Sequence, residues 1–378
     1  MLLGRSVWNG RIRLRLLNPM NRGKSFLCAQ GKHSFSLEKV KAIPELGLEG
    51  FLFRHEPSKA TLLHLSKPDR NCVFSLGFRT FPTDSTGAPH ILEHLALCGS
   101  RKYPVRDPFF KMLSRSLATY MNAWTSSDWT MYPFSTQNPT DYANLRDIYV
   151  DATFAPGLAE ADFRQEGWRL ERAEDGDQWK LMGVVYNEMK GVFSDTESLF
   201  SQLHQQTLLQ GSIYGHVSGG HPRDIPQLSH ARLIQFWRQH YNPANCLSVS
   251  YGDGQALDDH LAYMDRAFHT FMSKDAPLLA LGNPLDGLKR LEKPWRTVIQ
   301  AGAVDPLSDP ARQVRLLVSF MCNPITDVQS KFNMQILASL LLEGPSSPFH
   351  QALIDSNIGS EYAAGTGYDA SLPYILLG

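Results

Sequence analysis

Short apolar runs and amphipathic segments alternate along the chain, and they predict a mixture of strands and helices. Residues 50–56, 60–67 and 71–80 are three short apolar runs, which are typical of consecutive strands. A turn containing glycine and proline follows, and it predicts a helix that begins near Pro89. Residues 118–135 then alternate in the manner of a strand, a turn and a second strand. The predicted strands therefore flank this helix on both sides in sequence.

Apolar residues at helical spacing predict further helices in the middle of the chain. The first begins at Asn138 or Thr140 and ends near a proline. Residues 181–209 contain few helix breakers, so they are predicted to form one long helix. Residues 229–242 are predicted to form another, which leads into a strand at 245–253.

The length of 378 residues favours more than one domain. Residues 276–294 are rich in proline and glycine without any period, which predicts a linker. We therefore expect one domain at residues 33–275 and a second from residue 295. Beyond the linker, the pattern predicts strands at 296–302 and 312–323 and helices at 331–343 and 347–356.

Composition excludes few classes of function. Lys and Arg total 37, and Asp and Glu also total 37, so no global field favours nucleic acid or an anionic membrane. The five cysteines include no C-x-x-C pair, which is typical of free thiols in a reducing compartment. No apolar run is long enough to predict a membrane span. Partners must therefore be inferred from individual sites.

The first 37 residues differ from the rest because they hold no acidic residue. Seven Arg and Lys side chains interleave there with Leu, Ile, Trp and Ser, which is the composition of a mitochondrial transit peptide. We expect residues 1–32 to be that peptide, with a basic disordered tail as the alternative.

The segment His90-Ile-Leu-Glu-His94 predicts a zinc site on the helix near Pro89. Residues four apart share one face of a helix, so His90 and His94 can bind one metal ion. Glu93 lies on the same side and can accept a proton from the water that the metal activates. The alternative is a pair of surface histidines on an ordinary amphipathic helix.

A catalytic zinc ion needs a third protein ligand. The candidates downstream are six glutamates: Glu160, Glu166, Glu171, Glu174, Glu188 and Glu197. Glu188 is favoured because its apolar helical surroundings would make an unpaired carboxylate costly. Residues 119–126 could also offer a strand edge to a peptide, although a plain core strand fits their pattern equally well.

With these residues assembled, the chain from about His33 onward resembles the presequence protease branch of the pitrilysin/insulinase metallopeptidase family. The resemblance rests on long stretches rather than on five residues: 87–113, 121–142, 162–171, 183–195, 218–229 and 240–253. It implies that His90, His94 and Glu188 bind one zinc ion per chain and that Glu93 is the catalytic base. It also implies that Asn122 and Ala123 lie on the substrate-binding strand edge.

The resemblance implies an α+β fold of the pitrilysin type and a zinc metalloendopeptidase of the mitochondrial matrix. The expected partners are short unstructured peptides, namely cleaved presequences and peptides similar to amyloid-β, and the expected state is a monomer. Family members consist of two homologous halves, and this chain matches only the first half, ending inside the second domain, residues 295–378. One alternative is therefore a zinc- and peptide-binding fragment with weak or no catalytic activity. The other alternative is a different enzyme with a similar motif, such as a processing peptidase or a small-molecule lyase. The long sequence match outside the His90–His94 segment argues against this alternative.

Overall fold

The structure is a computed structural model. It describes residues 33–371 and 374–377, except for positions 174–175, 177, 253–256, 273–281, 283, 285–297, 300–301, 303, 306–308 and 310–312. The predicted transit peptide and nearly all of the predicted linker lie outside the described residues, as does most of the predicted strand at 296–302. The domain boundaries therefore stay predictions.

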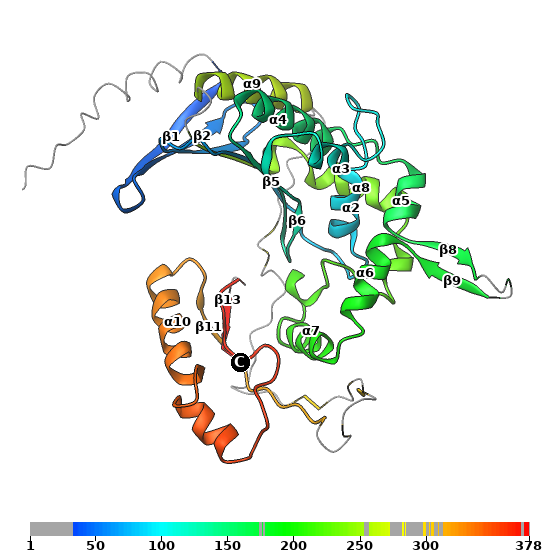
Figure 1. Cartoon of the computed structure of the whole chain (residues 1–378), viewed down its shortest axis with the longest axis vertical. Helices are drawn as coiled ribbons and strands as arrows, with labels where there is room; N and C mark the ends of the chain where they lie inside the picture. Colours follow the sequence, from blue (N-terminus) through cyan, green and yellow to red (C-terminus); the bar gives the residue numbers. More distant parts are fainter. Residues whose placement is uncertain are drawn as a thin grey trace, which may run out of the picture.

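One curved sheet organises the chain up to residue 271 (Figure 1). Its strands are β1 (Phe35–Ile43), β2 (Leu48–His55), β3 (Thr61–Ser66), β4 (Cys72–Arg79), β5 (Ala118–Met121), β6 (Trp124–Thr125), β7 (Trp129–Thr136) and β10 (Cys246–Tyr251). The strand order is β1-β2-β3-β10-β4-β7-β5, and β6 also pairs with β7. Neighbours are antiparallel except for β10 and β3, which run parallel. The late strand β10 therefore lies between two early ones.

Helices α4 (Pro139–Phe154) and α9 (Leu257–Phe271) lie over one face of this sheet (Figure 1). Phe74 of β4 and Phe134 of β7 are opposite one another in the ladder, with ring centroids 5.5 Å apart. Both rings contact Tyr142 of α4. Phe154 of α4 stacks on Phe271 of α9 at 5.3 Å. Because each buried aromatic side chain contributes about 1.5–3 kcal/mol, these contacts fix the two helices on the sheet.

Six shorter helices and a hairpin complete this part. They are α2 (Ala88–Ala96), α3 (Pro108–Leu113), α5 (Glu160–Glu166), α6 (Val184–Val192), α7 (Thr196–Leu208), α8 (His230–His240) and the strands β8 (Arg169–Arg172) and β9 (Trp179–Met182). Short 3₁₀ turns lie at Pro44–Leu46, Ile213–Gly215, Ile225–Gln227 and Pro243–Asn245. The sheet packed with helices confirms the α+β class.

Helix capping decides where two predicted helices begin. Asn138 Oδ1 accepts hydrogen bonds from the backbone N–H groups of Thr140 and Asp141, at 2.9 and 3.0 Å, so Asn138 is the cap of α4. The prediction of one helix over 181–209 was wrong, because the segment contains the end of β9, then α6, then α7. Asp195 accepts a hydrogen bond from the Ser198 N–H at 2.7 Å and thereby starts α7 as a separate helix.

The described residues after 312 form a three-stranded sheet, an α-helix and a π-helical segment. The sheet order is β11 (Phe320–Pro324), β13 (Tyr374–Leu377), β12 (Tyr368–Asp369), and helix α10 covers Val328–Leu342. The predicted strand at 312–323 was too long, because residues 313–319 are not in a strand. The helix expected at 331–343 is confirmed, and the one expected at 347–356 is a single π-helical segment, His350–Asp355.

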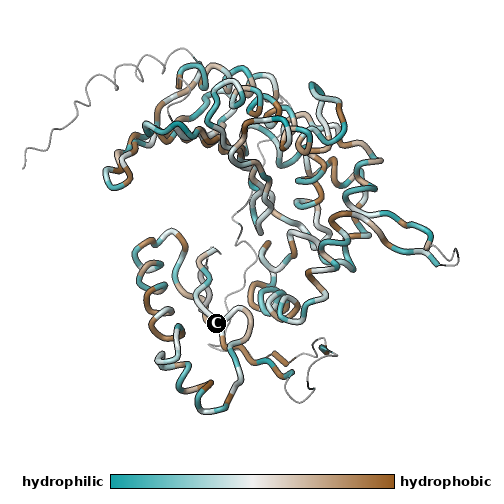
Figure 2. Tube along the Cα trace, in the orientation of Figure 1, coloured by the Kyte–Doolittle hydropathy of each residue, from teal (hydrophilic) through white to brown (hydrophobic). Residues whose placement is uncertain are grey.

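This C-terminal part contacts α7 through polar groups. The Glu197 carboxylate accepts hydrogen bonds from Arg315 Nε at 2.7 Å and from the Ala364 N–H at 3.2 Å. His204 Nε2 lies 2.6 Å from Ser319 Oγ. Helix α10 contains both apolar and polar residues (Figure 2). Across the described ranges, the structure contains no helix with both the length and the apolar character needed to cross a bilayer.

Candidate metal centre

Helix α2 carries the His90–His94 segment, and close backbone packing fixes the turn before it. Gly87 precedes the helix with φ 75°, in the left-handed region, and Pro89 occupies the first turn. A Cβ atom on Gly87 would lie 2.8 Å from Gly220 Cα and 2.9 Å from Gly219 O, so only glycine fits. This contact holds the loop of residues 219–220 against the start of α2.

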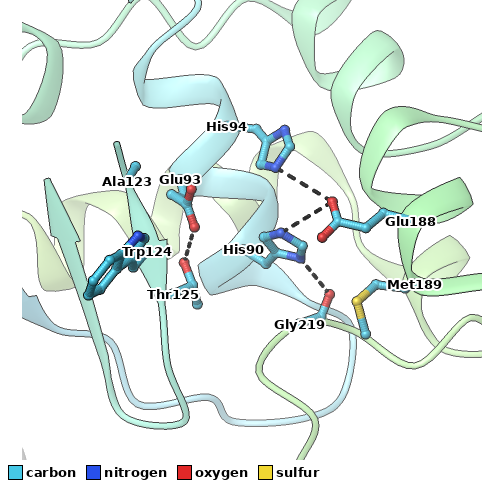
Figure 3. A pocket seen from close by; sticks show the side chains of 9 residues that line it. All are labelled: His90, Glu93, His94, Ala123, Trp124, Thr125, Glu188, Met189 and Gly219. Carbon is cyan, nitrogen blue, oxygen red and sulfur yellow. Dashed lines mark hydrogen bonds and ion pairs between the residues drawn. The ribbon is translucent and has the colours of Figure 1, made fainter. Parts of the chain in front are cut away.

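Each of the two histidines of α2 has one ring nitrogen near a fixed partner, and Figure 3 shows this for His90 and Gly219. His90 Nδ1 lies 3.1 Å from Gly219 O, and His94 Nδ1 lies 3.1 Å from Glu166 Oε2 at the end of α5. Carbonyl and carboxylate oxygens only accept hydrogen bonds, so each Nδ1 donates, and in the neutral ring each Nε2 then keeps a free lone pair. These partners therefore select, for the neutral rings, the tautomer that can bind a metal through Nε2.

Glu188 of α6 reaches both of these nitrogens. Its Oε2 lies 3.7 Å from His90 Nε2 and 4.0 Å from His94 Nε2. We call His90, His94 and Glu188 the ligand triad. A tetrahedral zinc ion spaces its ligand atoms by about 3.3 Å, so the two distances would have to shorten by about 0.4 and 0.7 Å. Two imidazoles and one carboxylate are a donor set that catalytic zinc uses, and the residues present therefore fit this metal.

The burial argument that favoured Glu188 was wrong, although the residue it selected is in place. The Glu188 side chain is 51% exposed, so its carboxylate is not a costly buried charge. It stands out because it points at two imidazoles.

Glu93 lies beside the ligand triad and is itself buried, at 9% exposure. Thr125 Oγ1 of β6 donates a hydrogen bond to Glu93 Oε2 at 2.7 Å (Figure 3). The residues of the ligand triad, Glu93 and Thr125 line one pocket of about 430 Å³, together with Ala123, Trp124, Met189 and Gly219. The structure thus brings the expected base and the three expected ligands into one cavity.

Charge in the pocket favours a cation. Burial lowers the pKa of His94, but its hydrogen bond to Glu166 and the carboxylates of Glu93 and Glu188 raise this pKa above the ordinary value overall. The same hydrogen bond lowers the pKa of Glu166. Three carboxylates therefore surround His94, and the resulting field attracts a divalent cation.

The other candidate third ligands lie elsewhere. Glu160, Glu171 and Glu197 form ion pairs with Arg164, Arg169 and Arg315, and Glu174 lies outside the described residues. Glu166 lies at the site but on the Nδ1 side of His94, where it orients the ring. Its role was missed because sequence cannot tell which nitrogen of an imidazole a distant carboxylate will face.

The two residues expected on the substrate strand differ in position. Ala123 lines the pocket, whereas Asn122 does not line it. The Asn122 N–H donates to Pro133 O of β7 at 3.1 Å, and Asn122 Oδ1 accepts from the Ala123 N–H at 2.9 Å. Both lie between β5 and β6, and β5 is the last strand in the sheet order. The segment is therefore at a sheet edge beside the pocket.

Comparison with known proteins identifies relatives of this chain. Residues 72–205 match the family model "Insulinase (Peptidase family M16)", and residues 227–376 match the model "Peptidase M16 inactive domain". The chain is 47% identical to a mitochondrial presequence protease of Schizosaccharomyces pombe, over 90% of this chain and 34% of that protein. It is 46% identical to a mitochondrial presequence protease of Mus musculus, over 89% and 32%. The chain thus spans about a third of the length of these relatives.

Solved structures of similar fold agree with this result. Pitrilysin superposes with a TM-score of 0.52 at 18% identity, over 67% of this chain and 26% of pitrilysin. A protease from Helicobacter pylori gives a TM-score of 0.53 at 15% identity, over 85% of this chain and 72% of that one. These likenesses confirm the pitrilysin-type fold. Two models from one family match consecutive segments of the chain, and the chain therefore belongs to peptidase family M16, the insulinase family.

Proposed function

We propose that this chain provides the zinc-dependent site of a metalloendopeptidase that degrades short unfolded peptides, chiefly cleaved mitochondrial presequences. The observation that carries the proposal is the convergence of the ligand triad and buried Glu93 in one pocket. The substrate class is taken from the relatives named as presequence proteases.

In the proposed reaction, the ligand triad holds one zinc ion. When bound, zinc polarises a carbonyl group and makes water nucleophilic at neutral pH. Thr125 holds Glu93 Oε2, which leaves Oε1 to accept a proton from the attacking water. Glu93 then returns this proton to the leaving amine. No covalent enzyme intermediate is needed.

The substrate would bind along the β5–β6 edge. An extended peptide can add there as a further strand, with main-chain hydrogen bonds that do not depend on its side chains. Asn122 and Ala123 are the proposed contacts, because they lie at the edge next to the pocket. Two versions of a test peptide can be made, one N-methylated at odd and one at even backbone positions. Only the version whose methyl groups block the hydrogen bonds to the strand edge should bind more weakly. Equal binding of the two versions would contradict strand addition.

We further propose a location in the mitochondrial matrix, with residues 1–32 as the transit peptide. The support is their composition, free of acidic residues, and the names of the relatives. A fluorescent reporter fused to residues 1–32 should enter mitochondria and lose a short segment on import. A reporter that stays in the cytosol would contradict the assignment.

The second candidate function is that of a fragment that holds zinc and a peptide with little or no turnover. One observation favours it: the chain covers only about a third of its curated relatives. Both functions share the ligand triad, so zinc binding does not separate them.

The deciding experiment uses an unstructured, presequence-like peptide with a quenched fluorophore. Glu93→Gln should retain about one zinc ion in the ligand triad and lose hydrolysis. Glu171→Gln is the matched control, since Glu171 is an exposed glutamate paired with Arg169, and it should behave as the parent chain. Hydrolysis that a chelator abolishes supports the peptidase, and saturable peptide binding without cleavage supports the binding fragment. Normal cleavage by Glu93→Gln would refute the assigned base.

A further inference from the structure

A second cluster of metal-ligating side chains lies where the end of β2 meets α9. It consists of His55, the last residue of β2, and of Asp265 and His269, one turn apart on α9. One ligand atom from each residue lies within 4.8 Å of the other two, which is also true of the ligand triad. Figure 1 shows α9 over β1 and β2, whereas α2 lies toward the other end of the sheet. The two clusters are therefore separate sites.

The distances in this cluster match those between the ligands of one cation. Asp265 Oδ1 lies 3.1 Å from His55 Nε2 and 3.6 Å from His269 Nε2. These values bracket the spacing of about 3.3 Å around tetrahedral zinc. The corresponding distances in the ligand triad are longer, at 3.7 and 4.0 Å. The two histidine rings of each cluster also share one arrangement, with centroids 5.1 Å apart and planes at 80° here and 79° there.

His55 has an outer partner of the kind that metal-binding histidines use. Its Nδ1 lies 2.7 Å from Ser58 Oγ, which also accepts a hydrogen bond from the Ala60 N–H at 3.2 Å. A cation on Nε2 selects the tautomer in which Nδ1 donates to Ser58 Oγ. The Ser58 N–H, 3.3 Å from Nδ1, serves the other tautomer, in which Nε2 donates to Asp265.

Burial fixes one side of the cluster and leaves the other open. His55 is fully buried, and its ring contacts the rings of Phe35 and Phe268 at 4.9 and 5.4 Å. Asp265 is 19% exposed and His269 is 44% exposed, so an ion can enter from solvent on the α9 side. One coordination position would remain for water.

We propose that His55, Asp265 and His269 form a second zinc site, distinct from the ligand triad, that joins the last turn of α9 to the end of β2. Two imidazoles and a carboxylate supply the protein ligands of tetrahedral zinc, and a water completes the set. The ion would link positions 210 residues apart in sequence. Its role is structural, because the site lies apart from the pocket and contributes no group to hydrolysis.

The test counts zinc bound per chain after loading with Zn²⁺ and removal of the excess. The parent should hold about two ions, His269→Asn about one, and the double variant His90→Asn/Glu188→Gln also about one. Combining the three substitutions should leave none. The proposal is overturned if His269→Asn binds as much zinc as the parent, or if the double variant binds none.

Two further variants separate ligation from folding. His33→Asn is the matched control, since His33 Nε2 pairs with Asp258 of the same helix at 3.2 Å but meets no third ligand among the residues that the structure describes; its zinc count should equal that of the parent. Asp265→Asn should lose the same single ion as His269→Asn. Saturating zinc should raise the unfolding midpoint of the double variant, in which only the second site remains. That rise should vanish when His269→Asn is added, and a rise that persists would refute the site.

Discussion

Replacing Glu166 with glutamine tests whether the carboxylate behind His94 contributes to metal binding. The change keeps the shape of the side chain but removes the charge that faces His94 Nδ1 at 3.1 Å. The Glu166 side chain is 12% exposed, so water cannot fully compensate for the lost charge. A hydrogen bond to a charged group contributes about 1.5–3 kcal/mol and one to a neutral amide about 0.5–1.5 kcal/mol, so the substitution should cost about 1–1.5 kcal/mol and lower zinc affinity by roughly 10-fold.

The pH dependence of this effect distinguishes ring orientation from a general structural role. Burial lowers the pKa of His94, but the hydrogen bond to Glu166 and the nearby carboxylates raise this pKa above its ordinary value. We expect the same carboxylate of Glu166 to strengthen zinc binding by His94. The neutral ring that binds zinc is lost as the pH falls through this raised pKa. The advantage of the parent chain over Glu166→Gln should therefore be largest at alkaline pH and should shrink on acidification.

The assay is competition with a chromophoric chelator at several pH values. Glu160→Gln is the matched control, because Glu160 lies on the same helix and pairs with Arg164 at the surface. It should leave the dissociation constant unchanged. Equal zinc affinity in Glu166→Gln and the parent, or a ratio that does not vary with pH, would refute the reasoning.

Three further predictions concern stability. Gly87→Ala should cost at least about 1–2 kcal/mol, because the new Cβ meets Gly220 in a left-handed turn; an unchanged thermal midpoint would contradict this. Asn138→Ala should cost about 1 kcal/mol in urea unfolding through loss of the α4 cap, and no loss would argue against capping. Burial lowers the pKa of His64 from 6.5 to about 4. Between these two pH values the unfolded state therefore binds a proton at His64 and the native state does not. Stability should therefore fall by about 2 kcal/mol between pH 8 and pH 5, and His64→Gln should abolish that part of the loss. A urea titration with the same pH slope in both chains would contradict the assignment.

Local patterns predicted the elements whose signals lie within a few residues. The i, i+4 spacing on an apolar helix located His90 and His94, and the alternation at 118–135 located β5, β6 and β7. Ser229 was correctly expected at the start of α8, where its hydroxyl accepts the Arg232 N–H at 3.3 Å. These features depend on neighbouring residues, which is why the sequence alone sufficed.

Features that depend on distant residues could not be predicted in the same way. Glu166 lies 72 residues from His94, and Gly219 lies 129 residues from His90, yet each fixes one ring nitrogen. The break between α6 and α7 was also missed, because the apolar period continues across it while Asp195 caps a new helix. Periodicity records which residues can be buried together, and it does not record which nitrogen a partner will face.

The position of β10 in the sheet constrains how the chain can fold during synthesis. Every member of the ligand triad has been synthesised once residue 188 leaves the ribosome. The loop that supports His90 has been synthesised once residue 220 leaves it. In the described sheet, however, β3 and β4 are joined through β10, which lies between them and ends at Tyr251. A nascent chain shorter than this carries two unpaired strand edges in the middle of its sheet, where other chains can add. We therefore expect the helix that carries His90 and His94 to gain a stable platform late and in one step, after contacts across nearly 190 residues form between Leu247–Tyr251 and Thr61–Leu65.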